Sequence, residues 1–163
     1  MEAEHPWRAA QAMKRICIIC EGQTEESFVN TVLASSLYGL GLNLIPEMIE
    51  TSPGHKGGAL SYERVKRHLR NTLRQKSSPI VTTFFDLYRL DTRFPSFEVA
   101  QKESFLAHKL EILRHALSED IVAVAECEPS RFIPHIQPHE AECKFFAGWI
   151  NQLRCLSNAL THV

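Results

Sequence analysis

The amino-acid sequence predicts an α/β fold, a single three-layer α/β/α domain around a mainly parallel, four-stranded sheet. Strand-like apolar runs alternate with amphipathic helical segments along the 163 residues, without internal repeats. The run at 79–86 is almost continuously apolar, which indicates a strand buried on both faces of a parallel sheet. We assign residues 1–12 to an N-terminal extension without a regular pattern, and residues 13–163 to the domain.

The strands are predicted from short runs rich in apolar and β-branched residues. They lie at 15–20, 42–51, 79–86 and 132–136. Pro46 favours an edge position for the second strand, because proline cannot donate a hydrogen bond within a sheet. Pro53 and the glycines that follow it predict a flexible loop at 53–58.

Four helices are predicted from apolar residues at helical spacing. They begin near Thr24, after the loop at 53–58, near Ser96 and after Glu140. Gly39 and Gly41 end the first, and residues 121–125 suit either a short additional strand or the end of the third. The residues expected to face the core are Phe28, Val29, Val32, Leu33, Leu37 and Leu40; Tyr62, Val65, Leu69, Thr72 and Leu73; Leu106, Leu110, Leu113 and Leu117; and Phe146, Trp149, Ile150, Leu153, Leu156 and Leu160.

The composition argues against several classes of protein. A formal net charge of -1 provides no global field for nucleic acid, so any such binding requires a local patch. The apolar runs are shorter than the roughly 20 residues of a membrane-spanning helix, and no secretory segment begins the chain, so we expect a cytoplasmic protein. Cys17 and Cys20 lie three apart in a strand and therefore point to opposite faces, which argues against a redox or zinc pair. We expect the cysteines to be buried thiols.

Two of the predicted central strands end in an acid, Glu21 after the first and Asp86 at the end of the third. If these strands are neighbours, both carboxylates lie at the carboxyl edge of the sheet, where α/β proteins bind ligands. Two carboxylates suit Mg²⁺, which takes its remaining ligands from water and substrate phosphates. Glu21 also suits a general acid or base. Alternatively, the two residues are a helix-capping carboxylate and an ordinary turn aspartate.

A local excess of positive charge accompanies the second helix. Between Gly54 and Ser78 the chain carries seven basic residues and one acid, Glu63. The residues that we assign to phosphate or nucleic-acid binding are Lys56, Arg64, Arg67, Arg70 and Arg74. The alternative is an ordinary solvated helix face.

Three segments resemble an uncharacterised family of TOPRIM-like proteins with a Rossmann-like fold. These segments are Glu21-Gly22-Gln23-Thr24-Glu25-Glu26, residues 82–88 and residues 131–140, and the similarity runs from about Met13 to Glu140. The family resembles the TOPRIM domains of topoisomerases, primases and OLD-type nucleases, and is often found with ATPases in bacterial phage-defence or restriction loci. The resemblance implies that Glu21 and Asp86 serve metal-dependent phosphoryl transfer.

The chain departs from this family at two places. Tyr88 stands where TOPRIM enzymes have a second aspartate, which removes a metal ligand. After Glu140 the acidic and aliphatic run of the family is replaced, and we interpret the chain as a truncated or diverged member. His139, Glu140 and Glu142 are further candidates at the acidic edge, with Glu140 as a third catalytic acid. His135, His139 and Cys143 have the spacing of zinc ligands, but Pro134 and Pro138 argue against a helix there.

Two functions therefore follow from the sequence. The first is a Mg²⁺-dependent phosphoryl-transfer enzyme that acts on nucleic acid, with Glu21, Asp86 and Glu140 as catalytic residues and Glu21 and Asp86 as metal ligands. The second is a phosphate-binding or nucleic-acid-binding module without turnover, or a partner of an ATPase in a defence system. Tyr88 and Arg89 are candidates for phosphate contact in either case, although Tyr88 is equally suited to packing over the sheet.

Overall fold

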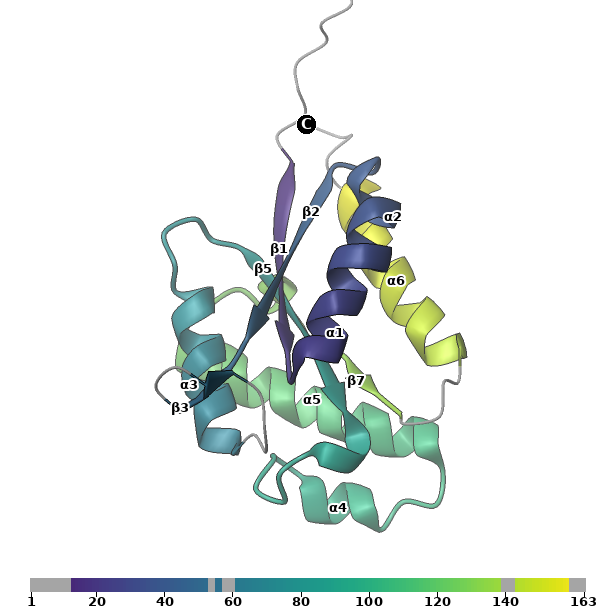
Figure 1. Ribbon diagram of the computed structural model, residues 1–163. Coiled ribbons are helices and arrows are strands. Elements are labelled where there is room, and N and C mark those ends of the chain that lie inside the picture. Colours follow the sequence, from purple (N-terminus) through teal and green to yellow (C-terminus); the bar gives the residue numbers. More distant parts are fainter. Residues whose placement is uncertain (1–12, 53–54, 57–60, 139–142, 159–163) are drawn as a thin grey trace, which may run out of the picture.

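The computed structural model describes residues 13–52, 55–56, 61–138 and 143–158 (Figure 1). A mainly parallel sheet lies between two layers of helices, which confirms the predicted three-layer α/β fold. The helices α1 (Gln23–Phe28), α2 (Ala34–Tyr38) and α6 (Cys143–Asn158) cover one face of the sheet. The helices α3 (Tyr62–Leu73) and α5 (Leu106–Ala125) cover the other.

The sheet contains the four predicted strands in the order β2, β1, β5 and β6, all parallel. Their bounds are Lys14–Cys20 for β1, Leu42–Met48 for β2, Ile80–Asp86 for β5 and Phe132–Ile133 for β6. The predicted first and third strands, β1 and β5, are therefore neighbours. Strand β2 lies at the edge, as Pro46 predicted.

The last predicted strand is divided into β6 and β7 (Ile136–Gln137), which pair with β5 in one continuous register. The interruption falls at Pro134, which has no N–H to donate. Thr83 replaces the lost backbone pairing with its side chain. Its hydroxyl donates to the His135 carbonyl at 2.7 Å and accepts the His135 N–H at 2.9 Å.

The first helical segment contains a π-helical turn, η1 (Val29–Leu33), between α1 and α2. Val29, Leu33 and Leu37 are buried, whereas Val32 and Leu40 are 45% and 42% exposed, so their predicted place in the core is wrong. A π turn holds more residues than an α turn. In this segment every fourth residue therefore packs against the sheet, whereas a regular α-helix would bury residues at alternating spacings of three and four.

The opposite layer follows its predicted pattern more closely. All five predicted core residues of α3 are buried. The predicted long helix from about Ser96 is two helices, because Phe105 adopts an extended backbone between α4 (Phe97–Gln101) and α5. Leu110, Leu113 and Leu117 of α5 are buried as predicted, Leu106 is partly buried, and residues 121–125 belong to the end of α5.

Helix α6 packs on the sheet through Trp149 and Leu153. The Trp149 Nε1–H donates to Thr82 Oγ1 at 3.0 Å, which ties the helix to the central strand β5. Ile150 and Leu156 are partly buried, whereas the predicted core positions Phe146 and Leu160 lie outside the residues whose side chains are described.

A small hairpin of β3 (Glu50–Ser52) and β4 (His55–Lys56) follows β2. The predicted strand at 42–51 therefore ends at Met48 and gives way to a separate two-stranded sheet. Part of the predicted loop at 53–58 also belongs to this hairpin. Its tip and the following residues, 53–54 and 57–60, lie outside the described part of the chain.

The cysteines divide between the core and the surface. Cys17 and Cys20 are buried in the two separate hydrophobic clusters on opposite faces of the sheet, as the strand spacing predicted. Cys127 is partly exposed and Cys155 is exposed, so burial was wrongly predicted for both. Within the described residues, no helix combines the length and apolarity needed to cross a membrane.

Candidate active site at the carboxyl edge of the sheet

Glu21 and Asp86 meet at the carboxyl edge of the sheet. Glu21 directly follows β1, Asp86 ends the neighbouring parallel strand β5, and the Glu21 Oε1 accepts the Asp86 backbone N–H at 3.3 Å. Only 6% of the Glu21 surface is exposed. The sequence places this acid at the edge because β1 ends at Cys20 and Gly22, in an extended conformation, turns the chain into α1.

The pKa of the Glu21 carboxyl lies near neutral pH. Burial raises its pKa to about 7, and the negative charges of Asp86 and Glu25 add to this increase. The Asp86 N–H and the positive charge of Arg89 oppose it. A carboxyl with a pKa near the working pH can both accept and release a proton, which is the property of a general acid or base.

Asp86 also organises the chain that follows it. Its carboxylate accepts the Tyr88 N–H at 3.0 Å and caps the short 3₁₀ helix η2 (Leu87–Arg89). Tyr88 is 75% exposed, so the alternative that its ring packs over the sheet is wrong. The capping bond confirms part of the alternative interpretation of Asp86 as a turn aspartate. It also leaves the carboxylate half-buried at the edge beside Glu21.

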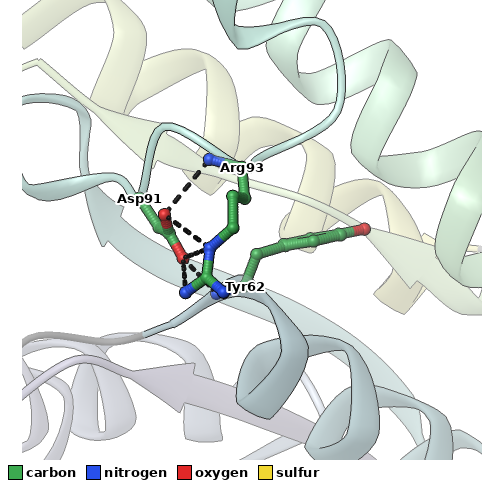
Figure 2. Close-up of polar contacts among 3 residues, drawn as sticks. All are labelled: Tyr62, Asp91 and Arg93. Carbon is green, nitrogen blue, oxygen red and sulfur yellow. Dashed lines mark hydrogen bonds and ion pairs between the residues drawn. The ribbon is translucent and has the colours of Figure 1, made fainter.

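The loop after η2 holds the basic helix α3 in position (Figure 2). Asp91 Oδ2 accepts the Tyr62 backbone N–H at 2.7 Å, and so caps α3 in place of Ser61, which makes no side-chain cap. Arg93 pairs with the same carboxylate at 2.9 Å. The Arg93 hydrogen bond, with help from the Tyr62 N–H, holds the Asp91 pKa at about 2. The acidic edge and the start of α3 are thus joined by one short loop.

Gln137 is a polar residue of the edge that the sequence patterns did not single out. It pairs with Asp86 in the parallel register of β5 and β7. Its Oε1 lies 2.9 Å from His135 Nε2, and the His135 ring stacks on Trp149 with the centroids 4.3 Å apart. With the Oε1 engaged by His135, the Gln137 amide N–H groups make no hydrogen bond to another described residue and can donate to a ligand.

His135 acts here as a neutral donor. Burial lowers its pKa to about 4, although the Gln137 contact opposes this effect. The neutral ring carries one proton, and a proton on Nε2 is the arrangement that matches the Gln137 Oε1 acceptor. His135 therefore lies in the break between β6 and β7 and orients Gln137, and it does not belong to a helix as the zinc-ligand spacing would require.

The family of the chain can now be stated. A family model described as a domain of unknown function (DUF4276) matches residues 20–154. The chain belongs to the DUF4276 family. No curated protein and no solved structure matches it. The matched region of the DUF4276 domain contains Glu21, Asp86 and Gln137, the three residues that meet at the carboxyl edge.

Three of the five basic residues that we assigned to phosphate or nucleic-acid binding lie on α3. Arg64, Arg67 and Arg70 are exposed on this helix. Arg74, at its end, donates to the Ala125 carbonyl at 3.2 Å and to Glu126 at 2.8 Å, so it also fastens α3 to the end of α5. Lys56 lies in β4, and its side chain is outside the described residues.

Several predicted site residues cannot be placed at the edge. His139, Glu140 and Glu142 lie outside the described residues, as does the Cys143 side chain. The third catalytic acid that we predicted, Glu140, therefore stays a prediction. Gln137, which pairs with Asp86, is one residue before the described segment ends at 138.

The donors at this edge fit Mg²⁺. Glu21 and Asp86 offer carboxylate oxygens, and Mg²⁺ is commonly held by one or two carboxylates with water and substrate phosphates as the remaining ligands. Among the residues that the structure describes, no group of three or more His, Cys, Asp and Glu side chains is arranged to hold a metal ion. The DUF4276 domain would thus contribute two ligands, a donor set that suits an open magnesium site better than a closed structural zinc site.

Proposed function

We propose that this DUF4276 domain is a Mg²⁺-dependent phosphoryl-transfer enzyme that acts on nucleic acid. The observation that carries the proposal is the Glu21 carboxyl, buried at a strand end against Asp86 with a pKa of about 7. The TOPRIM-like pattern of the sequence supports the same roles. The basic face of α3 supports a nucleic-acid substrate, because exposed arginines bind backbone phosphates.

Each residue at the edge has a defined part in this proposal. Asp86 and ionised Glu21 would hold the cation, which would polarise a phosphoryl oxygen and stabilise developing negative charge. Glu21 alternatively accepts the proton of the attacking water, since its pKa lies near neutral pH. Gln137 donates an amide N–H to a phosphate oxygen. Arg89 contributes positive charge beside Glu21.

Incubation of the purified protein with plasmid and with single-stranded DNA, plus Mg²⁺ or Mn²⁺, tests this function. We expect cleavage that is lost in Glu21→Gln and in Asp86→Asn. Glu128→Gln is the matched control, because Glu128 is an exposed acid that precedes η3 (Pro129–Arg131) and β6 and so lies at the opposite edge of the sheet. Cleavage that persists equally in all three variants would reject the assignment.

A binding module without turnover is the second candidate function. Tyr88 favours it, because this exposed residue occupies the place of the second aspartate in the TOPRIM pattern. Such a module would recognise phosphate or nucleic acid, or bind a partner ATPase of a defence system, with no need for Mg²⁺. Metal-independent DNA binding, or co-purification with an ATPase, combined with absent cleavage would select this function over the enzyme.

A further inference from the structure

A surface pocket of about 490 Å³ lies between α3 and the carboxyl end of β2. Residues 46–49 of the chain form one side of it, and α3 forms the other. The α3 side chains that line it are Arg64, Arg67, His68 and Asn71. Their spacing of three and four residues places them along one face of the helix. The pocket therefore has a row of hydrogen-bond donors on one wall.

The arginines give this wall the chemistry of a phosphate site. A guanidinium group presents five N–H donors in a planar fork that matches phosphate oxygens, and it stays charged at any physiological pH. Arg67 forms no hydrogen bond or ion pair with another described residue and is exposed. Asn71 adds an amide to the same wall, and its Oδ1 lies 3.4 Å from the Arg70 guanidinium.

Glu47, at the base of the pocket, is compensated by its neighbours. Its Oε2 lies 3.4 Å from His68 Nε2, and the pKa of Glu47 is lowered by His68, Cys17 and Arg15, with His68 as the main cause. The charged form of the Glu47 carboxyl is therefore stabilised by its neighbours. Glu26 is the other acid of the pocket and lies on the α1 side, away from the arginine wall.

The pocket lies beside the candidate active site. Cys20 pairs with Met48 in the register of β1 and β2, so Glu21 and Ile49 follow at the same level of the sheet. Neighbouring strands are about 4.8 Å apart. Met48 and Ile49 line the pocket, whereas Glu21 accepts the backbone N–H of Asp86 from the neighbouring strand β5. A nucleic-acid strand that crosses the carboxyl edge at Glu21 can therefore reach the arginine wall with a neighbouring phosphate.

We propose that this pocket binds a backbone phosphate of a nucleic-acid strand, next to the phosphodiester that lies at Glu21 and Asp86. The position of the reacting phosphodiester rests on the proposed function, whereas binding of a phosphate by Arg64 and Arg67 does not. Two neighbouring phosphate sites restrict the substrate class. The ligand is an oligonucleotide with consecutive phosphates, rather than a mononucleotide or a phosphomonoester.

Binding of a labelled single-stranded DNA of about 12 nucleotides tests the pocket, a length within the site sizes of single-strand binders. The measurement uses the Glu21→Gln variant without divalent cations, so that no cleavage interferes. We expect Arg67→Ala and Asn71→Asp each to weaken binding about tenfold, as loss of a charge-assisted contact or addition of a repelling charge does. Lys76→Ala is the matched control, because it removes one positive charge from an exposed position between α3 and β5 that does not line this pocket.

The outcomes separate the pocket from general electrostatic attraction and from the enzyme function. Equal weakening in Arg67→Ala and Lys76→Ala would overturn the pocket, as would the absence of any DNA binding. Competition by inorganic phosphate or a mononucleotide as effective as that by the oligonucleotide would overturn the substrate class. Selective loss of binding in Arg67→Ala without any cleavage by the wild type would keep the pocket and reject the enzyme. Thermal unfolding of each variant checks that it is folded.

Discussion

Burial of the Glu21 side chain opposes ionisation of its carboxyl. It is almost fully buried and lies close to the carboxylates of Asp86 and Glu25, while Arg89 offers partial compensation. An ionised acid in this environment costs folding free energy, since its charged form is stabilised less than in water. Proteins retain such a destabilising buried acid mainly where it serves function. Substitution of Glu21 therefore tests both the stability cost and the proposed function.

Substitution of Glu21 by glutamine should stabilise the protein in a pH-dependent way. The folded-state pKa of about 7 lies above the unfolded value of 4.5, so below about pH 4.5 the acid is neutral in both states and the substitution changes little. As the pH rises through 7, the wild type loses stability that the variant keeps, up to roughly 3 kcal/mol. Urea unfolding at pH 5 and pH 8 measures the difference. A gain that is the same at both pH values would contradict the buried, raised-pKa acid.

Gln137 and His135 allow activity to be separated from stability. Under the proposed function, Gln137→Ala should lower kcat by about 10- to 100-fold, as loss of an orienting contact does, with KM little changed. His135→Phe should act in the same direction, because the Nε2–H that orients Gln137 is lost. Yet it should not lower the melting temperature, since phenylalanine keeps the stack on Trp149 and removes the buried Nδ1 that lacks a partner. Unchanged turnover in both variants would remove Gln137 from the site.

At the scale of single residues, the sequence predicted Glu21 and Asp86 as site residues but not Gln137. Glu21 and Asp86 were found because each ends an apolar run, and strand ends share an edge when the strands are neighbours. Gln137 was missed because its place depends on the register of a strand that Pro134 interrupts. Its signal was present in the alternation of His135 and Gln137, which points both side chains to one face of the sheet. Nothing local, however, indicates that Asp86 lies opposite.

At the scale of elements, helix α3 is predictable because its pattern is regular, and the first helical segment is not. The buried positions of α3 follow the α-helical period throughout. The π turn η1 breaks that period at Val29–Leu33 without a proline or glycine to announce it. The break between α4 and α5 likewise falls where no proline or glycine stands, between Gln101 and Leu106. Tertiary packing decides both, and a single sequence carries little trace of it.

The remote cap of α3 is an element-level feature whose strength can be measured. Asp91→Ala removes the acceptor of the Tyr62 N–H and the partner of Arg93, and should destabilise the protein by about 1–2 kcal/mol at neutral pH. Arg93→Ala removes only the exposed ion pair and should destabilise the protein less than Asp91→Ala does. Urea unfolding of the two variants makes the comparison.

The pH dependence gives a second check on this cap. The folded-state pKa of Asp91 is about 2, below its unfolded value of 3.8, so the stabilisation is present above about pH 4 and is lost as the pH falls toward 2. The difference between Asp91→Ala and the wild type should therefore shrink over that range. If Arg93→Ala proved as damaging as Asp91→Ala, the ion pair rather than the cap would hold the loop.

At the scale of the whole molecule, the fold joins two kinds of chemistry that are separate in the sequence. The acids lie at the ends of β1 and β5, and the arginines lie on a helix that packs on β1 and β5. The alternation of strands and helices predicted the layers, because each layer requires its own apolar pattern. The pocket between α3 and β2 was not predictable, since it depends on how closely the helix packs across an edge strand. The basic residues between Gly54 and Ser78 predicted only that this part of the surface is positively charged.

Magnesium should stabilise the folded protein through the two acids. A cation that binds only the folded state at tenfold its dissociation constant adds about 1.4 kcal/mol, which corresponds to a rise of roughly 3–6 °C in melting temperature for a domain of this size. The rise should vanish in Asp86→Asn and Glu21→Gln and persist in Glu128→Gln. It should also weaken below pH 7, because protons compete for Glu21. Differential scanning fluorimetry of the four proteins at pH 6 and pH 8, with and without Mg²⁺, measures this. An equal shift in all four would place the cation elsewhere, and no shift in the wild type would favour the metal-independent binding module.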